Sequence, residues 1–160
     1  YSSPNEYVVS LEAAGKLYID KFVRHDPVPY EVADLLEIAK GPVTKILVSL
    51  AGGQPGLVSL PDLPTGVAVM TAGGGAYTSI LSPEATKESG IEAVLSELQI
   101  DWPNVMAFGD DLNDLGMLAA SGIGVAMGNS VPEALQAANR VTLSNTEDGV
   151  AIVLEALLQG

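Results

Sequence analysis

Four polar side chains that could do chemistry lie within five residues of one another: Asp110, Asp111, Asn113 and Asp114. They follow an apolar run, residues 105–108, that ends at a glycine. Carboxylate and amide oxygens are the ligands that a hard cation such as Mg²⁺ prefers. Aspartate and asparagine are also favoured at helix N-termini, where they accept hydrogen bonds from free backbone N–H groups. Capping accounts for one or two of the four residues, so a metal or phosphate site and a capped helix both stay open.

The elements around this cluster place it at the end of a strand. Residues 105–108 are consecutively apolar, as in a fully buried strand, and the leucines of residues 112–120 recur at helical spacing. In open parallel sheets, ligands bind beyond the carboxyl ends of the strands. Asp110 is therefore a predicted site residue.

The second half of the chain alternates between helices and strands. Ser130 to Glu133 has the form of a capping box with proline early in the helix. Alternation of this kind favours βαβ units and a parallel sheet. Apolar spacing predicts helices at 91–98, 112–120 and 150–158 and strands at 105–108, 123–127 and 140–143.

The first half is rich in strands. Residues 7–23 are typical of a hairpin with a turn at residues 14–16, and Pro29 is expected to open a helix that Gly41-Pro42 closes. The triple glycine at 73–75 favours a hairpin turn over a phosphate loop, because no Gly-Lys-Ser/Thr follows it. Further strands are predicted at 43–50, 67–71 and 77–81.

These patterns predict two domains with a boundary near Leu81. Residues 1–81 are expected to form a mostly antiparallel α+β part, and residues 82–160 a parallel α/β part. The fold class is therefore α/β.

The composition restricts the classes of partner. Of the 160 residues, 48% are hydrophobic and 17% charged, and the formal net charge is −13. This charge repels the phosphate backbone, so no nucleic-acid partner is expected. The negative charge does not exclude small phosphorylated substrates, because bound Mg²⁺ would supply local positive charge. There is no cysteine, which predicts a cytoplasmic protein without disulfides, and no apolar run is long enough to span a membrane.

Three motifs carry a resemblance to a known family. They are Gly109-Asp110-x-x-Asn113-Asp114, Gly124-Val125-Ala126-Met127-Gly128-Asn129 and Glu147-Asp148-Gly149-Val150. In this order they resemble the C-terminal half of Cof-type phosphatases of the haloacid dehalogenase (HAD) superfamily, whose core is Rossmann-like. The match runs over residues 83–158, and residues 1–81 are similar, more weakly, to the later part of the family's α/β cap.

The resemblance implies specific roles. Family members transfer a phosphoryl group to an aspartate and then to water, with Mg²⁺ as cofactor. Asp110 matches a metal ligand, Asn113 a residue that helps to position the substrate phosphate, and Asp114 the acid that supports the phosphate-binding lysine. Lys87 matches that lysine, which stabilises phosphoryl oxygens electrostatically. Asp111 falls on a variable position and is interpreted as a capping residue or an outer partner of the metal site.

The chain also departs from the family's pattern. The nucleophile of the family lies in an Asp-x-Asp motif, which the 160 residues do not contain; Asp20 and Asp26 are the nearest candidates. Gln99 stands where a glycine is usual and Asn139 where an aspartate is usual. His25, the one histidine, has no serine or cysteine motif around it and is expected to lie at the surface.

Two hypotheses follow. In the first, the chain is a fragment of a Mg²⁺-dependent phosphatase that acts on small phosphorylated metabolites such as sugar phosphates; by itself it is inactive and pairs with itself or with a missing N-terminal segment. In the second, it is a non-catalytic HAD-like domain that binds a partner or an anion. An Asp-x-Asp motif upstream of Tyr1 would favour the first.

Overall fold

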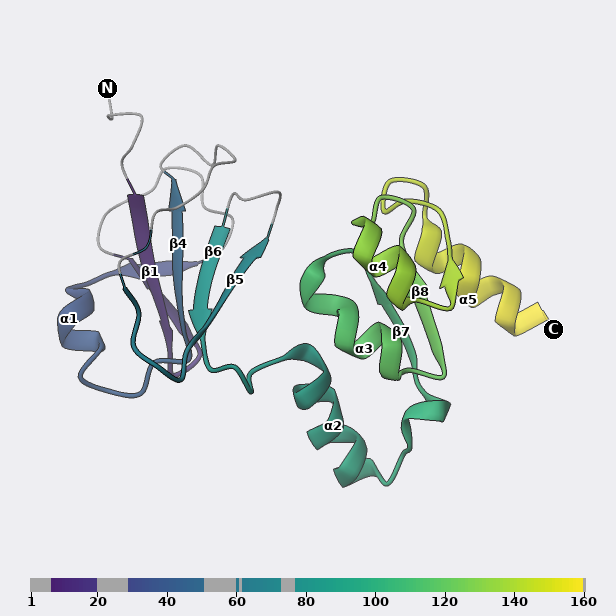
Figure 1. Cartoon of the computed structure of the whole chain (residues 1–160), viewed down its shortest axis with the longest axis horizontal. Coiled ribbons are helices and arrows are strands. Elements are labelled where there is room, and N and C mark those ends of the chain that lie inside the picture. The colour runs from purple at the N-terminus through teal and green to yellow at the C-terminus, as the bar shows by residue number, and fades with distance from the viewer. Residues whose placement is uncertain (1–6, 20–28, 51–59, 61, 73–76, 160) are drawn as a thin grey trace. The chain divides into compact units, whose positions relative to one another are not determined.

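The computed structural model of the chain describes residues 7–19, 29–50, 60, 62–72 and 77–159. The chain divides into two compact units, Tyr1–Pro83 and Glu84–Gly160 (Figure 1). Each unit has its own sheet. The prediction of an α/β protein with a parallel sheet beside an α+β part is confirmed.

The first unit is built on a six-stranded sheet with the strand order β3-β2-β1-β4-β6-β5 (Figure 1). All neighbours pair antiparallel except β2 and β3, which run parallel. The predicted hairpin of β1 and β2 is present, and its turn has left-handed φ values of 49° at Ala14 and 74° at Gly15. The strands are β1 (Tyr7–Ala13), β2 (Lys16–Ile19), β3 (Tyr30–Val32), β4 (Lys45–Leu50), β5 (Ala68–Ala72) and β6 (Tyr77–Leu81).

The prediction of a helix that starts at Pro29 is wrong for its first residues. Residues Tyr30–Val32 are strand β3, which pairs with β2, and the helix α1 covers only Leu35–Ile38. Asp34 determines this start, because its carboxylate accepts a hydrogen bond from the Leu36 N–H at 2.9 Å. The predicted strands at 67–71 and 77–81 form the antiparallel pair β5–β6. The linking glycines 73–75 lie outside the described residues, as do Asp20, Asp26 and His25.

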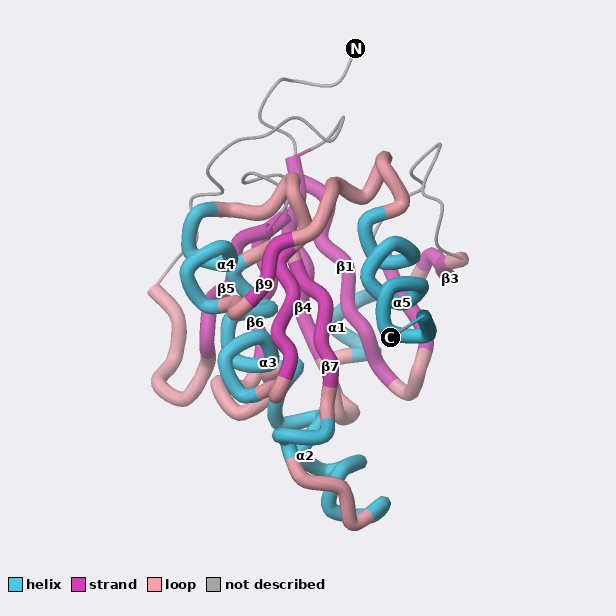
Figure 2. Tube along the Cα trace, turned by 90° about the vertical axis from the view of Figure 1, so that its right-hand side faces the viewer, coloured by secondary structure: helices cyan, strands magenta, loops and turns pink. Residues whose placement is uncertain are grey.

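The second unit has a three-stranded parallel sheet in the order β7-β8-β9. Helices α3 and α4 lie on one side of this sheet and α5 on the other (Figures 1 and 2). Its core is made of small and aliphatic side chains, of which Leu118, Val125 and Ala134 are almost fully buried. The elements are α2 (Lys87–Leu98), β7 (Met106–Gly109), α3 (Leu115–Ala120), β8 (Ile123–Ala126), α4 (Pro132–Ala137), β9 (Arg140–Val141) and α5 (Gly149–Gln159).

Two local predictions for this unit are corrected. The capping box at Ser130–Glu133 is absent: Val131 is the N-cap of α4 without a side-chain bond, and the Ser130 hydroxyl donates instead to the Gly109 carbonyl at 3.3 Å. The helix expected at 112–120 begins with a 3₁₀ turn, Leu112–Asp114, before α3. Among the described residues, none of the helices is both long and apolar enough to cross a bilayer.

Candidate active site

The predicted cluster lies at the carboxyl end of β7, where the chain enters the 3₁₀ turn before α3. Asp110 is exposed and directly follows the strand. The Asp111 carboxylate accepts a hydrogen bond from the Leu112 N–H at 2.7 Å, so this residue caps the turn. Capping therefore accounts for Asp111. It does not account for Asp110, whose Oδ2 accepts a hydrogen bond from the Asn129 amide at 3.2 Å.

Asp114 is the buried centre of the site, with 2% of its surface exposed. Its Oδ2 accepts hydrogen bonds from the N–H groups of Asp110 at 2.9 Å and Asp111 at 3.1 Å. Its Oδ1 forms an ion pair with Lys87 Nζ. The structure thus brings together two predicted site residues, Lys87 and Asp114, that are 27 positions apart in the sequence.

Gly109 makes room for Asp114. A Cβ atom at position 109 would lie 2.5 Å from Asp114 Cβ and 2.7 Å from its Cγ. These distances are far below van der Waals contact, and the atoms are near the backbone, where they cannot swing away. The glycine that ends the predicted strand is therefore required by the close approach of the carboxylate.

Lys87 is placed by the start of α2. The Thr86 hydroxyl accepts a hydrogen bond from the Ser89 N–H, and the Ser89 hydroxyl accepts one from the Thr86 N–H, both at 3.1 Å. This reciprocal pair makes Lys87 the first helical residue. Its side chain is 48% exposed while its charge contacts the buried Asp114.

The charge of Asp114 is maintained against its burial. Burial is the largest effect and raises the pKa of this carboxyl, but the hydrogen bond from Lys87, the two backbone N–H donors and the lysine charge together hold the pKa below its ordinary value of 3.8. Between Glu84 and Gly160 the only basic residues are Lys87 and Arg140. Lys87 is therefore a rare positive charge in an acidic unit.

Asn113 carries an unusual oxygen. Its Oδ1 is buried and has no hydrogen-bond partner in the part of the chain that the structure describes. Buried polar atoms are normally paired, and exceptions are found where a ligand, ion or water supplies the missing partner. This observation fits a residue that contacts a bound group.

The residues present fit a cation only in part. Among the described residues there is no group of three or more histidine, aspartate or glutamate side chains that could hold a metal ion. Asp110 offers one exposed carboxylate, and the unpaired Oδ1 of Asn113 is a further oxygen in the same short segment. A single carboxylate with several waters is a known way to hold Mg²⁺, but it is a weak one.

The segment after β8 ends the motif 124–129 that contributes to the family resemblance, but the sequence alone assigned no role to its residues. The N–H of Met127 donates to the Gly109 carbonyl at 3.0 Å, and the N–H of Val131 donates to the Asp110 carbonyl at 2.9 Å. Asn129 contacts the Asp110 side chain from the same segment. The available signal was its position, because polar residues after neighbouring parallel strands meet at the same edge of the sheet.

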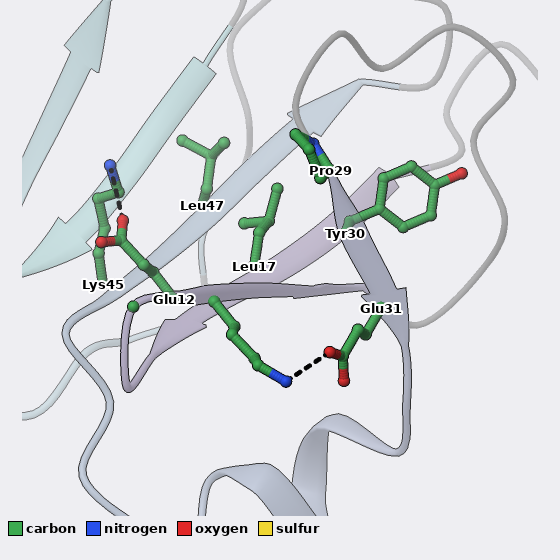
Figure 3. Close-up of a pocket in the computed structure, with 9 residues that line it drawn as sticks. Glu12, Leu17, Pro29, Tyr30, Glu31, Lys45 and Leu47 are labelled. Atoms are coloured by element: carbon green, nitrogen blue, oxygen red, sulfur yellow. Dashed lines mark hydrogen bonds and ion pairs between the residues drawn. The ribbon is translucent and has the colours of Figure 1, made fainter.

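The first unit contains a separate pocket of about 810 Å³ (Figure 3). Leu17, Leu47 and Tyr30 supply its apolar part. Its charged groups pair with one another: Lys45 with Glu12 at 3.5 Å, and Lys16 with Glu31 at 2.7 Å. None of the predicted site residues lines this pocket.

Comparison with known proteins supports the assignment of the motifs. Residues 18–154 match the model of the family described as haloacid dehalogenase-like hydrolase. Two Bacillus subtilis proteins are similar: phosphatase YwpJ is 42% identical over 77 residues, and 5-amino-6-(5-phospho-D-ribitylamino)uracil phosphatase YitU is 41% identical over 76 residues. Each match covers 48% of this chain and 27% and 28% of the respective relative. The matched part of the chain thus spans under a third of the length of these curated relatives.

Solved structures share the fold. TM0651 from Thermotoga maritima has a TM-score of 0.71 at 24% identity, over 94% of this chain and 61% of the other. The HAD subclass IIB sugar phosphatase BT4131 has a TM-score of 0.70 at 17% identity, over 94% of this chain and 60% of the other. At such identities the likeness concerns the fold alone. Together with the family match, it confirms the resemblance seen in the motifs: the chain belongs to the family of haloacid dehalogenase-like hydrolases.

Proposed function

We propose that these 160 residues are part of a Mg²⁺-dependent phosphatase that acts on small phosphorylated metabolites such as sugar phosphates. The observation that carries the proposal is the ion pair between Lys87 and the buried Asp114, next to the exposed carboxylate of Asp110. The sugar phosphatase BT4131 and the 5-amino-6-(5-phospho-D-ribitylamino)uracil phosphatase YitU among the similar proteins support this class of substrate. We further propose that residues 1–81 serve as a cap segment and residues 82–160 as part of the core, in a cytoplasmic enzyme.

The proposed roles follow from charge and access. Phosphoryl transfer depends mainly on positioning and on stabilising the charge of the phosphoryl oxygens. Lys87 would bind these oxygens, because its side chain is half-exposed and the ion pair with Asp114 directs its ammonium group. The Asn113 amide NH₂ group would donate a hydrogen bond to the same phosphate, because the Oδ1 of this side chain can only accept. Asp110 would hold Mg²⁺, which when bound supplies positive charge for the transferred group.

The phosphoryl acceptor is not among these residues. The 160 residues contain no Asp-x-Asp pair, and the groups described here bind and orient but do not attack. The 160-residue chain alone is therefore expected to be inactive. The same absence supports the second candidate, a HAD-like domain that binds a partner or an anion without turnover.

The test is hydrolysis of a panel of sugar phosphates by the full polypeptide encoded by the gene, with Mg²⁺ and with a chelator. We expect turnover that the chelator abolishes and that Asp110→Asn lowers about a hundredfold or more. Asp101→Asn is the matched control, because Asp101 is an exposed aspartate of the same unit whose side chain makes no capping bond. Near-normal turnover in Asp110→Asn, or no turnover by the wild type on any ester, would contradict the proposal.

A further inference from the structure

We infer that Asn129 is a positioning residue that fixes the direction of the Asp110 carboxylate and links it to the turn before α5. The inference rests on the proposed function in one respect, namely that Asp110 holds the metal. The geometry itself is independent of that role.

Asn129 uses both ends of its amide. Its Oδ1 accepts a hydrogen bond from the Asn145 N–H at 2.9 Å, and its Nδ2 donates to Asp110 Oδ2 at 3.2 Å. The two partners determine which end is which, because a backbone N–H can only donate and a carboxylate can only accept. A flipped amide would lose both bonds. Asn129 is therefore held in one orientation, with a donor directed at Asp110.

Asp110 needs such a partner. Its side chain is exposed, and exposed side chains change rotamer freely unless a contact holds them. A hydrogen bond to a carboxylate is stronger than one between neutral groups. Outer partners of this kind orient a metal ligand and typically change metal affinity tenfold to a hundredfold when they are removed.

The backbone around Asn129 is fixed without its side chain. The N–H groups of Met127 and Val131 bond to the carbonyls of Gly109 and Asp110, and the Gly128 N–H donates to the Leu143 carbonyl at 3.1 Å. Removal of the Asn129 side chain should therefore leave the segment in place. The variant should lose only two hydrogen bonds: the one that orients the Asp110 carboxylate and the one from the Asn145 N–H.

That turn connects β9 to α5 and is closed by its own bonds. The Ser144 N–H donates to the Glu147 carboxylate at 3.2 Å, and the Gly149 N–H donates to the Ser144 carbonyl at 3.3 Å. Asn145 lies inside this turn and donates its N–H to Asn129. A ligand that displaces the turn would thus break the hydrogen bond between Asn145 and Asn129 and free the amide that orients Asp110.

Asn129→Ala in the 160-residue chain tests the inference, and Asn139→Ala is the matched control. Asn139 also uses both ends of its amide, accepting from the Gly124 N–H at 3.1 Å and donating to the Gly122 carbonyl at 3.2 Å, but it does not bond to Asp110. The readout is nuclear magnetic resonance: three-bond couplings report the χ1 rotamer of Asp110, and hydrogen exchange reports protection of the Asn145 N–H.

We expect one Asp110 rotamer and a protected Asn145 N–H in the wild type and in Asn139→Ala. In Asn129→Ala we expect averaged couplings and exchange at least several-fold faster. An Asp110 rotamer that is unchanged in Asn129→Ala, or already averaged in the wild type, would overturn the inference.

A second arm uses Mn²⁺ as the probe, since this ion broadens nearby amide signals when it binds. In Asn129→Ala, the Mn²⁺ concentration that gives half-maximal broadening around Asp110 should rise about tenfold or more. In Asn139→Ala it should stay at the wild-type value. Equal affinity of the two variants would also overturn the inference. If the wild type shows no broadening at Asp110, the proposed metal role fails, while the rotamer result still decides whether Asn129 positions the carboxylate.

Discussion

Asp114 is a buried carboxylate whose ionisation depends on Lys87. In Lys87→Met, burial is opposed only by the two backbone donors, so we expect the pKa of Asp114 to rise relative to the wild type. A pH titration followed by the ¹³C chemical shift of the Asp114 side-chain carboxyl group measures this change. Lys45→Met is the control, because Lys45 pairs with Glu12 in the other unit and should leave Asp114 unaltered.

The sign of the pH dependence follows from the lowered pKa. The ionised carboxylate stabilises the fold above the ordinary value of 3.8, and this contribution is lost as the pH falls through the lower folded-state value. The difference in free energy of unfolding between wild type and Asp114→Asn should therefore be constant at neutral pH and shrink only in the acid range. A wild-type midpoint for Asp114 at or above 3.8 would contradict this account.

Gly109 gives a third prediction at the residue scale. Gly109→Ala should destabilise the second unit by about 1–3 kcal/mol, because the added methyl group overlaps Asp114. Gly90→Ala is the control: a Cβ there meets nothing within 4 Å, and alanine is the better residue inside helix α2, so a gain of up to about 1 kcal/mol is expected. Urea unfolding measures both, and equal effects of the two variants would show that the overlap is relieved elsewhere.

At the scale of elements, helix α2 ends in a strained residue. Gln99 has φ 56° and ψ 41°, the left-handed region that glycine adopts at many helix ends. Gln99→Gly should therefore stabilise the unit by about 1 kcal/mol, since the strain removed outweighs the entropy that glycine adds to the unfolded chain. The midpoint of thermal unfolding of this unit should move upward by about 4–8 °C.

Gln136→Gly provides the comparison for that change. Gln136 is an exposed residue inside α4, where glycine costs about 0.5–1 kcal/mol. A loss of stability in both variants would mean that the end of α2 rearranges and that its left-handed residue is not strained.

The strands and helices that could be predicted from the sequence are those with a single strong periodic pattern. The apolar run at 105–108 and the helical leucines after it gave β7 and α3 to within a few residues. Tyr30–Val32 was missed because Pro29 also suits a helix start, and only pairing with β2 makes these residues a strand. Ser130 was misassigned because its hydroxyl has a tertiary partner, the Gly109 carbonyl, that no local pattern reveals.

The site was predictable to the extent that its residues lie next to recognisable elements. Asp110 follows a strand and lies in a motif, and Lys87 opens a helix at the position where the family resemblance expects a lysine. The contact between Lys87 and Asp114 was expected only from the family resemblance, and the two-ended bonding of Asn129 was not expected, because both depend on how separate elements pack. Such contacts between distant residues leave no local signal in one sequence.

At the scale of the whole molecule, β7 is an edge strand. In the described part of the chain it pairs only with β8, through the carbonyls of Val105 and Gly109, which accept from Ile123 and Met127. Backbone groups of successive residues in a strand point to alternate sides, so the N–H groups of Met106 and Phe108 point away from β8. An apolar edge with free backbone groups pairs readily with another chain.

We therefore expect the 160-residue chain to self-associate, with a mass by light scattering above 16.5 kDa. Met106→Pro should reduce the association, because it removes an outward donor without touching β8, and Val105 already has the extended backbone that precedes proline. A stable wild-type monomer would show that another part of the chain covers this edge.

The central claim is that Lys87 and Asp114 act as one phosphate-binding unit beside Asp110. Its most direct test is the rate of sugar phosphate hydrolysis by the full polypeptide in Lys87→Ala, Asp114→Asn and the double variant. Each single change should lower the rate about a hundredfold or more, and the double variant should be no slower than the worse single one, because groups that act together are not additive. Near-normal turnover in either single variant, or losses that multiply, would contradict the claim.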